Sequence, residues 1–350
     1  MVLEIPDTTG EPVPQPRPSR VASTDEQGLW RFCTAPMMDW SDRHCRFFWR
    51  LLSRRARLYT EMVTTGALLH GDAGRHLDFD PAELPLALQL GGSDPKELAT
   101  CARMAENWGY SEVNLNCGCP SDRVRNGAFG ACLMLRPQAV KSSLEAMLDA
   151  CSIPITVKHR LGVDAMDSYQ EFRDFVACVS ESGCNVFVIH ARHAWLKGLS
   201  PKENREVPPL RHEWVYQLKR EMPALTVVLN GGINSLDEGM AHLGELDGVM
   251  LGRRAYQDPW VLANVDQLFF GEDNPTQSRE QVLASLEPYI EGVLRRGGRL
   301  NHVTRHVLGL YQCVPGARRF RRYLSTHAHR DGAAVETLKA ARAQLVDRAA

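Results

Sequence analysis

The sequence predicts a (β/α)8 barrel, the TIM barrel, followed by a small all-helical C-terminal domain. Two observations support this fold class. Short apolar or β-branched runs alternate with turns and helix-like stretches eight times over roughly 240 residues, the usual size of such a barrel. Each run also ends, at its C-terminal side, in residues that are costly to bury without a partner or in glycines.

Eight segments are predicted as strands, because each is a short apolar or β-branched run that a turn terminates. They are residues 31–35, 58–62, 86–90, 112–116, 155–158, 186–190, 226–230 and 248–252. Helices are predicted between them, several opened by a capping Ser or by Pro in the first turn. They include residues 95–108, 137–150, 168–182, 212–221 and 235–243.

A doubly wound open sheet is the alternative fold, and the residues at the strand ends argue for the barrel. A barrel would bring all eight ends around one pocket, where the active sites of such barrels lie. The groups at these ends are Pro36-Met37-Met38-Asp39, Glu61, Gln89, Asn116 with Cys119, Lys158, His190, Asn230-Gly231-Gly232 and Gly252-Arg253-Arg254. No G-x-G-x-x-G motif follows the first strand, which argues against a Rossmann dinucleotide domain.

The composition suggests three regions in the chain of 350 residues. Residues 1–27 are rich in proline and polar residues, and we interpret them as a disordered extension. Residues 28–272 form the predicted barrel, for which a hydrophobic content of 44% is sufficient. Residues 273–350 form the predicted helical domain.

The chain shows neither an apolar run of eighteen residues nor a secretory signal pattern, so a cytoplasmic protein without a membrane span is expected. Ten cysteines occur at no regular disulfide spacing, which suits a reducing compartment. A lone C-x-C motif without a second pair of ligands predicts no metal site.

The formal net charge of -1 conceals a basic C-terminal region. Between Thr276 and Ala350 there are 13 Lys and Arg residues against 6 Asp and Glu residues. Such a face is often only solvated surface. With Tyr311, Phe320 and Tyr323 interleaved, it also fits a footprint on a phosphate backbone.

The segment 113–130 is the most informative stretch of the chain. In the strand 112–116, Asn114 and Asn116 alternate with apolar residues and therefore share one face. The strand ends at a Cys-Gly-Cys-Pro turn that leaves Cys119 at the rim. A thiol held there beside amides is placed for proton transfer or attack, and the alternative is a small buried hydrophobe.

The last two strand ends indicate a phosphorylated cofactor. Gly231, Gly232 and Gly252 offer backbone N–H groups with no Cβ in the way, and Arg253 adds a guanidinium. The ends of the seventh and eighth strands are the place where barrels commonly bind phosphate.

Seven motifs together resemble those of the tRNA-dihydrouridine synthases, which are FMN-dependent barrel enzymes. The motifs are APMMDW at 35–40, LQLGG at 88–92, NLNCGCPSDRV at 114–124, VKHR at 157–160, IHAR at 189–192, NGGI at 230–233 and LGRRAY at 251–256. The resemblance spans about residues 30–345. The stretches 194–210 and 315–325 are similar to the DusA subgroup, which acts on uridines 20 and 20a of the D-loop.

The resemblance implies FMN as cofactor, NADPH or NADH as reductant and the D-loop of tRNA as partner, with a monomer expected. It implies that Cys119 donates a proton. The implied FMN contacts are Pro36, Met37, Met38, Gln89, Lys158, His190, Asn230, Gly231, Gly232, Gly252 and Arg253. The implied tRNA contacts are Asn116, Lys202, Arg205, Arg318 and Arg321. Cys117 departs from the family pattern, because many relatives carry an apolar residue there, and it raises the alternative of oxidation or exchange with Cys119.

Two other functions remain open at this point. One is an FMN barrel that reduces a free pyrimidine or enone, with the helical tail as an oligomer contact. The other is a non-catalytic RNA-binding or chaperone protein that keeps the barrel as a scaffold. The basic tail favours the tRNA enzyme over the first alternative, and the presence of both Cys119 and Lys158 argues against the second.

Overall fold

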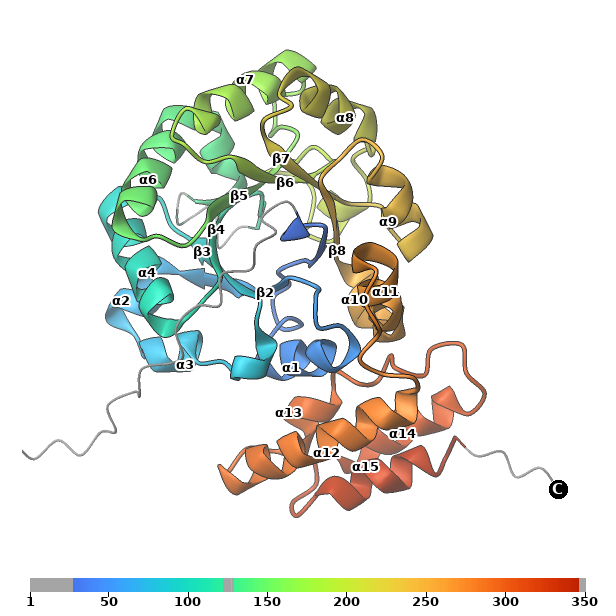
Figure 1. Ribbon diagram of the computed structural model, residues 1–350. Coiled ribbons are helices and arrows are strands. Elements are labelled where there is room, and N and C mark those ends of the chain that lie inside the picture. Colours follow the sequence, from blue (N-terminus) through green and yellow to red (C-terminus); the bar gives the residue numbers. More distant parts are fainter. Residues whose placement is uncertain (1–27, 122–126, 128, 346–350) are drawn as a thin grey trace, which may run out of the picture.

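The computed structural model describes residues 28–121, 127 and 129–345 (Figure 1). Eight strands form one parallel sheet in the order β1-β8-β7-β6-β5-β4-β3-β2. They are β1 (Phe32–Thr34), β2 (Leu58–Thr64), β3 (Leu86–Gly91), β4 (Glu112–Cys117), β5 (Ile155–Arg160), β6 (Val186–His190), β7 (Thr226–Asn230) and β8 (Gly248–Leu251). All eight predicted strands are therefore present, with ends that differ from the prediction by at most two residues.

The sheet is closed where β1 meets the start of β2. The Thr34 N–H donates to the Arg57 carbonyl at 2.9 Å, and the Arg57 N–H donates to the Phe32 carbonyl at 3.0 Å. Cys33 forms a parallel bridge with Arg57. The predicted TIM barrel is thus confirmed, and the open doubly wound sheet is excluded.

Helices follow the strands and surround the barrel (Figure 1). They are α1 (Arg43–Leu52), α2 (Thr65–His70), α3 (Ala73–Leu77), α4 (Pro95–Trp108), α6 (Pro137–Ala150), α7 (Tyr169–Ser180), α8 (His212–Glu221), α9 (Leu236–His242), α10 (Arg253–Gln257) and α11 (Val265–Phe270). Their starts have local causes: the Asp94 side chain caps α4, and Ser168 and Glu171 form a capping box at α7.

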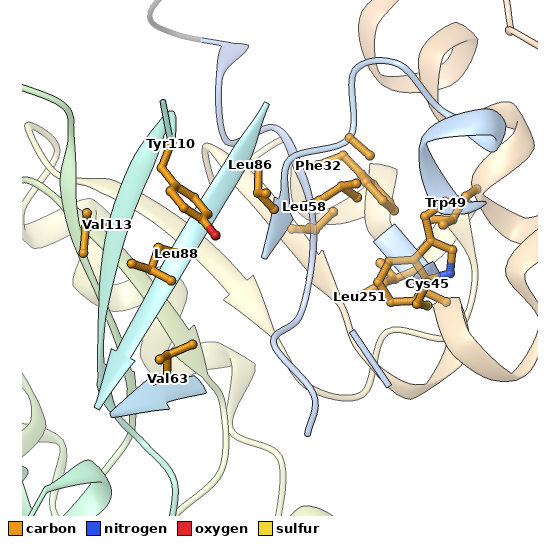
Figure 2. Packing of buried hydrophobic residues seen from close by; sticks show 14 of the residues in the cluster. Phe32, Cys45, Trp49, Leu58, Val63, Leu86, Leu88, Tyr110, Val113 and Leu251 are labelled. Carbon is orange, nitrogen blue, oxygen red and sulfur yellow. The ribbon is translucent and has the colours of Figure 1, made fainter. Parts of the chain in front are cut away.

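The two faces of the sheet bury different residues, because side chains alternate along each strand. Phe32, Leu58 and Leu86 point outward and belong to the large core between barrel and helices, which also contains Trp49 of α1 (Figure 2). The barrel interior holds a separate small cluster. Its buried members are Trp30, Cys33, Ala35, Tyr59, Ala87, Val186, Val188, Val228 and Met250. The interior is therefore a packed core, with polar residues above and below it.

Four helices follow the barrel: α12 (Arg279–Arg295), α13 (Leu300–Thr304), α14 (Ala317–His327) and α15 (Val335–Arg342). They lie beside α1 and α11 (Figure 1). Asp42, which caps α1, accepts hydrogen bonds from Arg305 and His306. Phe47 of α1 stacks on Tyr289 of α12 with ring centroids 3.9 Å apart. The predicted boundary at 272/273 lies between α11 and α12, and we propose it as the domain boundary.

Two predictions fall wholly or partly on residues that the structure does not describe. The predicted disordered extension, 1–27, lies outside the described residues, and so do residues 122–124 of the NLNCGCPSDRV motif. Within the described ranges, no helix is long and apolar enough to cross a membrane. The same residues contain no cluster of three or more His, Cys, Asp or Glu side chains that could hold a metal ion.

Candidate active site

The C-terminal ends of the strands bring most of the predicted site residues to one mouth of the barrel. Register pairs Asn116 with Lys158, and it pairs His190 with both Arg160 and Asn230. Gln89 lies beside Asn114 in the same sheet. Because these residues all occupy inward positions of their strands, their side chains meet above the apolar interior cluster.

The turn that carries Cys119 is held by Asn116. Its Oδ1 accepts the backbone N–H groups of Gly118 at 3.1 Å and of Cys119 at 3.0 Å. Cys119 is partly exposed, and its Sγ lies 3.4 Å from the Ser121 hydroxyl. The thiol thus lies at the rim, as the sequence predicted, and the Asn116 side chain helps to hold its turn.

Cys117 faces the other way. It is the last residue of β4, it is fully buried in the core between barrel and helices, and burial raises the pKa of its thiol above the usual range. A protonated thiol on the outer face of the strand is a packing residue. The alternative of exchange between Cys117 and Cys119 therefore has no support in this geometry, because the Cys117 thiol is enclosed in the core whereas Cys119 lies partly exposed in the turn after the strand.

Gln89 and Asn116 are joined directly. The Asn116 Nδ2 donates to the Gln89 Oε1 at 2.8 Å, and the Gln89 Nε2 donates to the Asn114 Oδ1 at 2.8 Å. Both side chains are buried, at 1% exposure for Gln89 and 8% for Asn116. Gln89, a predicted cofactor contact, and Asn116, a predicted tRNA contact, are thus hydrogen-bonded to each other, and Asn116 is also bonded to the Cys119 turn.

Lys158 makes one side-chain hydrogen bond to the described residues. Its Nζ donates to the Asn230 Oδ1 at 3.0 Å, and the Asn230 Nδ2 donates to the Met250 carbonyl at 2.8 Å, which fixes the amide. Burial, aided by the neighbouring Arg160, lowers the pKa of Lys158 from 10.5 to about 7. An ammonium group with lowered pKa and spare N–H donors is suited to an anionic ligand.

His190 is neutral at physiological pH, because burial and the nearby cations Arg160 and Lys158 hold its pKa well below the usual range. Its ring contacts the next strand end: a Cβ on Gly231 would lie 2.6 Å from the His190 Cδ2. Gly231 and Gly232 have φ values of +103° and +80°, which side chains with a Cβ rarely adopt. The predicted phosphate-binding turn is therefore a strand end that requires glycine.

Arg253 starts α10 directly after Gly252, and its guanidinium pairs with the Glu206 carboxylate at 2.5 Å. Both side chains are well exposed, at 39% and 45%. An exposed ion pair is worth about 0–1 kcal/mol, so an incoming phosphate can compete for this arginine.

Pro36, Met37 and Met38 follow β1 at the same mouth. The Met37 N–H donates to the Ser41 hydroxyl at 2.9 Å, and the Asp39 N–H, two residues later, donates to the Glu61 carboxylate at 2.5 Å. Met38 is 52% exposed. An exposed apolar side chain over a polar mouth suits contact with a flat ring.

Arg160 is a site residue that the sequence-based list missed. It is 3% exposed, and its guanidinium donates to three carbonyls: Gly118 at 3.2 Å, His193 at 3.1 Å and Asn204 at 2.7 Å. It thereby ties the Cys119 turn to the loop that carries Lys202 and Arg205. The signal in the sequence was its position two residues after Lys158, on the inward face of the same strand.

The loop with Lys202 and Arg205 is also shaped by Asn204, which is fully buried and exchanges hydrogen bonds with the backbone of Trp195. Trp195 is 42% exposed beside His193, with ring centroids 5.0 Å apart. Lys202 and Arg205 are exposed. The structure therefore places two predicted tRNA contacts and an exposed indole near the mouth.

Arg318 and Arg321 lie away from this cluster, on α14 of the tail. On this helix Arg319 donates to the Gln344 carbonyl at 2.9 Å, and Arg321 donates to Gln312 at 3.2 Å. A surface depression of about 480 Å³ at the start of α14 is lined by Arg318, Arg319 and Arg321 among others.

A TIM barrel with a thiol, buried amides and several cations around one mouth is the arrangement of a barrel enzyme. The family model described as dihydrouridine synthase (Dus) matches residues 33–346. The chain belongs to the dihydrouridine synthase family of enzymes.

Curated relatives match almost the whole chain. A protein of Pseudomonas putida is 60% identical over 316 residues, which cover 90% of this chain and 91% of the relative. A protein of Escherichia coli K12 is 56% identical over 326 residues, covering 93% and 94%. Both are named tRNA-dihydrouridine(20/20a) synthase.

Among solved structures, a complex of 2-naphthoyl-CoA reductase is similar at a TM-score of 0.50 and 11% identity. The match covers 68% of this chain and spans about half, 50%, of that one. At this identity the likeness concerns the fold alone.

Proposed function

We propose that this protein is an FMN-dependent oxidoreductase that reduces the C5–C6 double bond of uridine to 5,6-dihydrouridine at positions 20 and 20a of the tRNA D-loop. The observation that carries the proposal is the Cys119 turn. It holds a partly exposed thiol beside two buried amides and within electrostatic reach of Lys158, in a chain whose relatives are synthases of this name.

The residues at the mouth fit FMN. Gly231 and Gly232, Gly252 and Arg253 would hold the phosphate, since in the described chain no protein acceptor takes the N–H groups of the first two glycines. Lys158 and Gln89 would face the polar edge of the ring, His190 and Asn230 would lie nearby, and the segment Pro36-Met37-Met38 would cover its apolar part. The lowered pKa of Lys158 supports this assignment, because an anionic ring would stabilise its charged form.

When bound and reduced by NADPH or NADH, the flavin would supply the hydride that C6 of uracil accepts. Negative charge then develops on C5 and O4, because the C5–C6 bond is conjugated to the C4 carbonyl. Cys119 would donate its thiol proton to C5, and Asn116, fixed by Gln89 and by the turn, would hold the base. The resulting thiolate would be stabilised by Arg160 and Arg205, whose charges lie close to Cys119.

A uridine in a folded loop becomes reachable when it is extruded from its stack, which costs a few kcal/mol. Contacts outside the pocket would offset this cost. Lys202 and Arg205 at the mouth, and Arg318 and Arg321 on α14, would bind tRNA phosphates. The nicotinamide donor would use the same pocket before tRNA, so initial-rate patterns should be of the ping-pong type, and intersecting patterns would contradict this order.

The decisive experiment is nucleoside mass spectrometry with position mapping on tRNA from a host that lacks its own D-loop synthases. The wild-type protein and Cys119→Ala are expressed in parallel, and flavin content is measured in both. We expect dihydrouridine at positions 20 and 20a with the wild type only. A yellow, well-expressed wild type that leaves these positions as uridine would instead favour a flavin reductase for small molecules.

A further inference from the structure

A chain of hydrogen bonds runs through the barrel interior, from a buried carboxylate to the turn that carries Cys119. Thr156 donates its hydroxyl to the Glu112 Oε1 at 2.5 Å, and the Asn114 Nδ2 donates to the Thr156 Oγ1 at 2.7 Å. The chain continues from Gln89 to the Asn114 Oδ1 and from Asn116 to the Gln89 Oε1, both at 2.8 Å.

At one end of this series of hydrogen bonds, the Glu112 carboxylate fixes which groups donate and which accept. Glu112 is fully buried, and besides Thr156 it accepts hydrogen bonds from Trp30 at 2.8 Å, from Tyr59 at 2.8 Å and from Arg57 at 3.0 Å. An ionised carboxylate can only accept, so the Thr156 proton must point toward it. The Thr156 oxygen is then left to accept from the NH2 group of Asn114, which orients that amide.

At the other end, the backbone of the Cys119 turn fixes the same order of donors and acceptors. The N–H groups of Gly118 and Cys119 can only donate, so the Asn116 oxygen must face them and its NH2 group must face Gln89. The Gln89 oxygen accepts from Asn116, which leaves its NH2 group for Asn114. The two ends thus demand the same orientation of all three amides, and rotating any one of them would place two donors or two acceptors face to face.

We propose that Glu112 and Thr156 are positioning residues for the reaction, which set the orientation of Gln89 and Asn116 and thereby hold the Cys119 turn. Neither touches the mouth, and both act through Asn114. The proposal deepens the function proposed above, because Gln89 and Asn116 are the side chains through which that function contacts flavin and uracil. It also explains why an anion lies inside a packed barrel core, where burial of a charge requires full pairing.

The test replaces the one hydroxyl that links the anion to the amides. Thr156→Val keeps the shape of the side chain and Thr156→Ala removes it, whereas Thr156→Ser retains the hydroxyl. The two hydroxyl-free variants should lower kcat per flavin-loaded protein about tenfold, the usual effect of one lost buried hydrogen bond on a positioned group. KM for tRNA should stay within about twofold, since no tRNA contact is changed. Thr156→Ser should resemble the wild type.

A second readout does not depend on turnover. The rate of alkylation of Cys119, followed by peptide mass spectrometry, should rise in Thr156→Val and Thr156→Ala, because a rotated Asn116 no longer holds the turn. Ser53→Ala is the matched control. It removes another buried hydroxyl, bonded to Asp266 where α1 leads into β2, and should lower the melting temperature without changing kcat or the alkylation rate.

The inference is overturned if both hydroxyl-free variants keep the kcat and the Cys119 alkylation rate of the wild type. It is also overturned if Thr156→Ser loses as much as Thr156→Val, because the hydroxyl would then be irrelevant. Failure of the proposed function is distinguishable: the wild type would form no dihydrouridine, while the alkylation rates would still report whether Thr156 holds the turn.

Discussion

Replacing Lys158 by methionine should stabilise the flavin-free protein while weakening its affinity for flavin. Burial, with Arg160 nearby, lowers the pKa of Lys158 from 10.5 to about 7. One unit of pKa corresponds to about 1.4 kcal/mol, so at pH 7 the buried ammonium costs up to about 4 kcal/mol of folding free energy. Lys158 is partly exposed, and water at the mouth makes this figure an upper limit.

The change of the unfolding free energy with pH is a more specific test of the lowered pKa than its value at one pH. Between pH 7 and 10.5 the unfolded chain keeps a proton on Lys158 that the folded chain has released, so the free energy of unfolding rises with pH in this window. The cost therefore falls by about 2 kcal/mol between pH 7 and pH 9. Methionine has no charge, so the advantage of Lys158→Met over the wild type should shrink by the same amount. The hydrogen bond lost at Asn230 is the same at both pH values and cancels.

The assay is equilibrium urea unfolding of flavin-free wild type and Lys158→Met at pH 7 and pH 9, with flavin affinity measured by fluorescence titration. Lys202→Met, which removes an exposed lysine from the nearby loop, should change neither the pH dependence of unfolding nor flavin binding. An advantage of Lys158→Met that is equal at the two pH values would refute the argument, because it would mean that Lys158 keeps an ordinary pKa in the folded protein.

Three further outcomes are expected. Cys119→Ala should lower turnover about 10²- to 10⁴-fold, measured as dihydrouridine formed per bound flavin, and near-normal turnover would remove Cys119 from the mechanism. Arg318→Ala combined with Arg321→Ala should raise the Kd for tRNA and reduce its salt dependence, because binding releases fewer counterions when fewer phosphates are contacted. If the dependence of Kd on salt concentration were unchanged, the tRNA-binding surface would lie elsewhere. Burial alone would raise the pKa of Asp42, but its bonds with His306 and Arg305 lower it, so this contact between α1 and the tail should weaken as pH falls below about 4. Asp42→Asn should mimic that loss at pH 7, seen as faster amide exchange in α13, and unchanged exchange would contradict it.

The strands and their inward faces could be predicted from the sequence, because a buried parallel barrel requires short apolar runs with alternating faces. Val186–His190 and Thr226–Asn230 have the predicted bounds. The helices were equally predictable: Pro95–Trp108, which Asp94 caps, and His212–Glu221, which has no side-chain cap, both match the expected ranges. The grouping of the polar residues at one mouth could then be predicted as well, because the C-terminal ends of parallel strands all lie on the same side of a barrel.

The connections across the barrel could not be predicted, because they depend on how neighbouring strands are staggered. Thr156 is an unremarkable strand residue in the sequence, yet register places it beside Asn114, where it links that amide to Glu112. Arg160 could be assigned to the inward face, but its three carbonyl partners come from two other connections, Gly118 from the one after β4 and His193 and Asn204 from the one after β6. Such partners are set by tertiary packing, of which a single sequence carries little trace.

The placement of charge would allow a nearly neutral chain to bind the proposed polyanion, tRNA. At the base of the barrel the Glu112 carboxylate is paired with Arg57. At the mouth, burial lowers the pKa values of Lys158, Arg160 and Arg205, and repulsion from neighbouring cations lowers them further. Mutual repulsion among cations is relieved when an anion binds between them. Since the net charge of the whole chain is -1, attraction for phosphate has to come from local groups of cations such as those at the mouth and in the tail. Affinity for tRNA should therefore depend on these two surfaces together, and neutralising either one alone should leave the other able to bind phosphate without presenting uridine to Cys119.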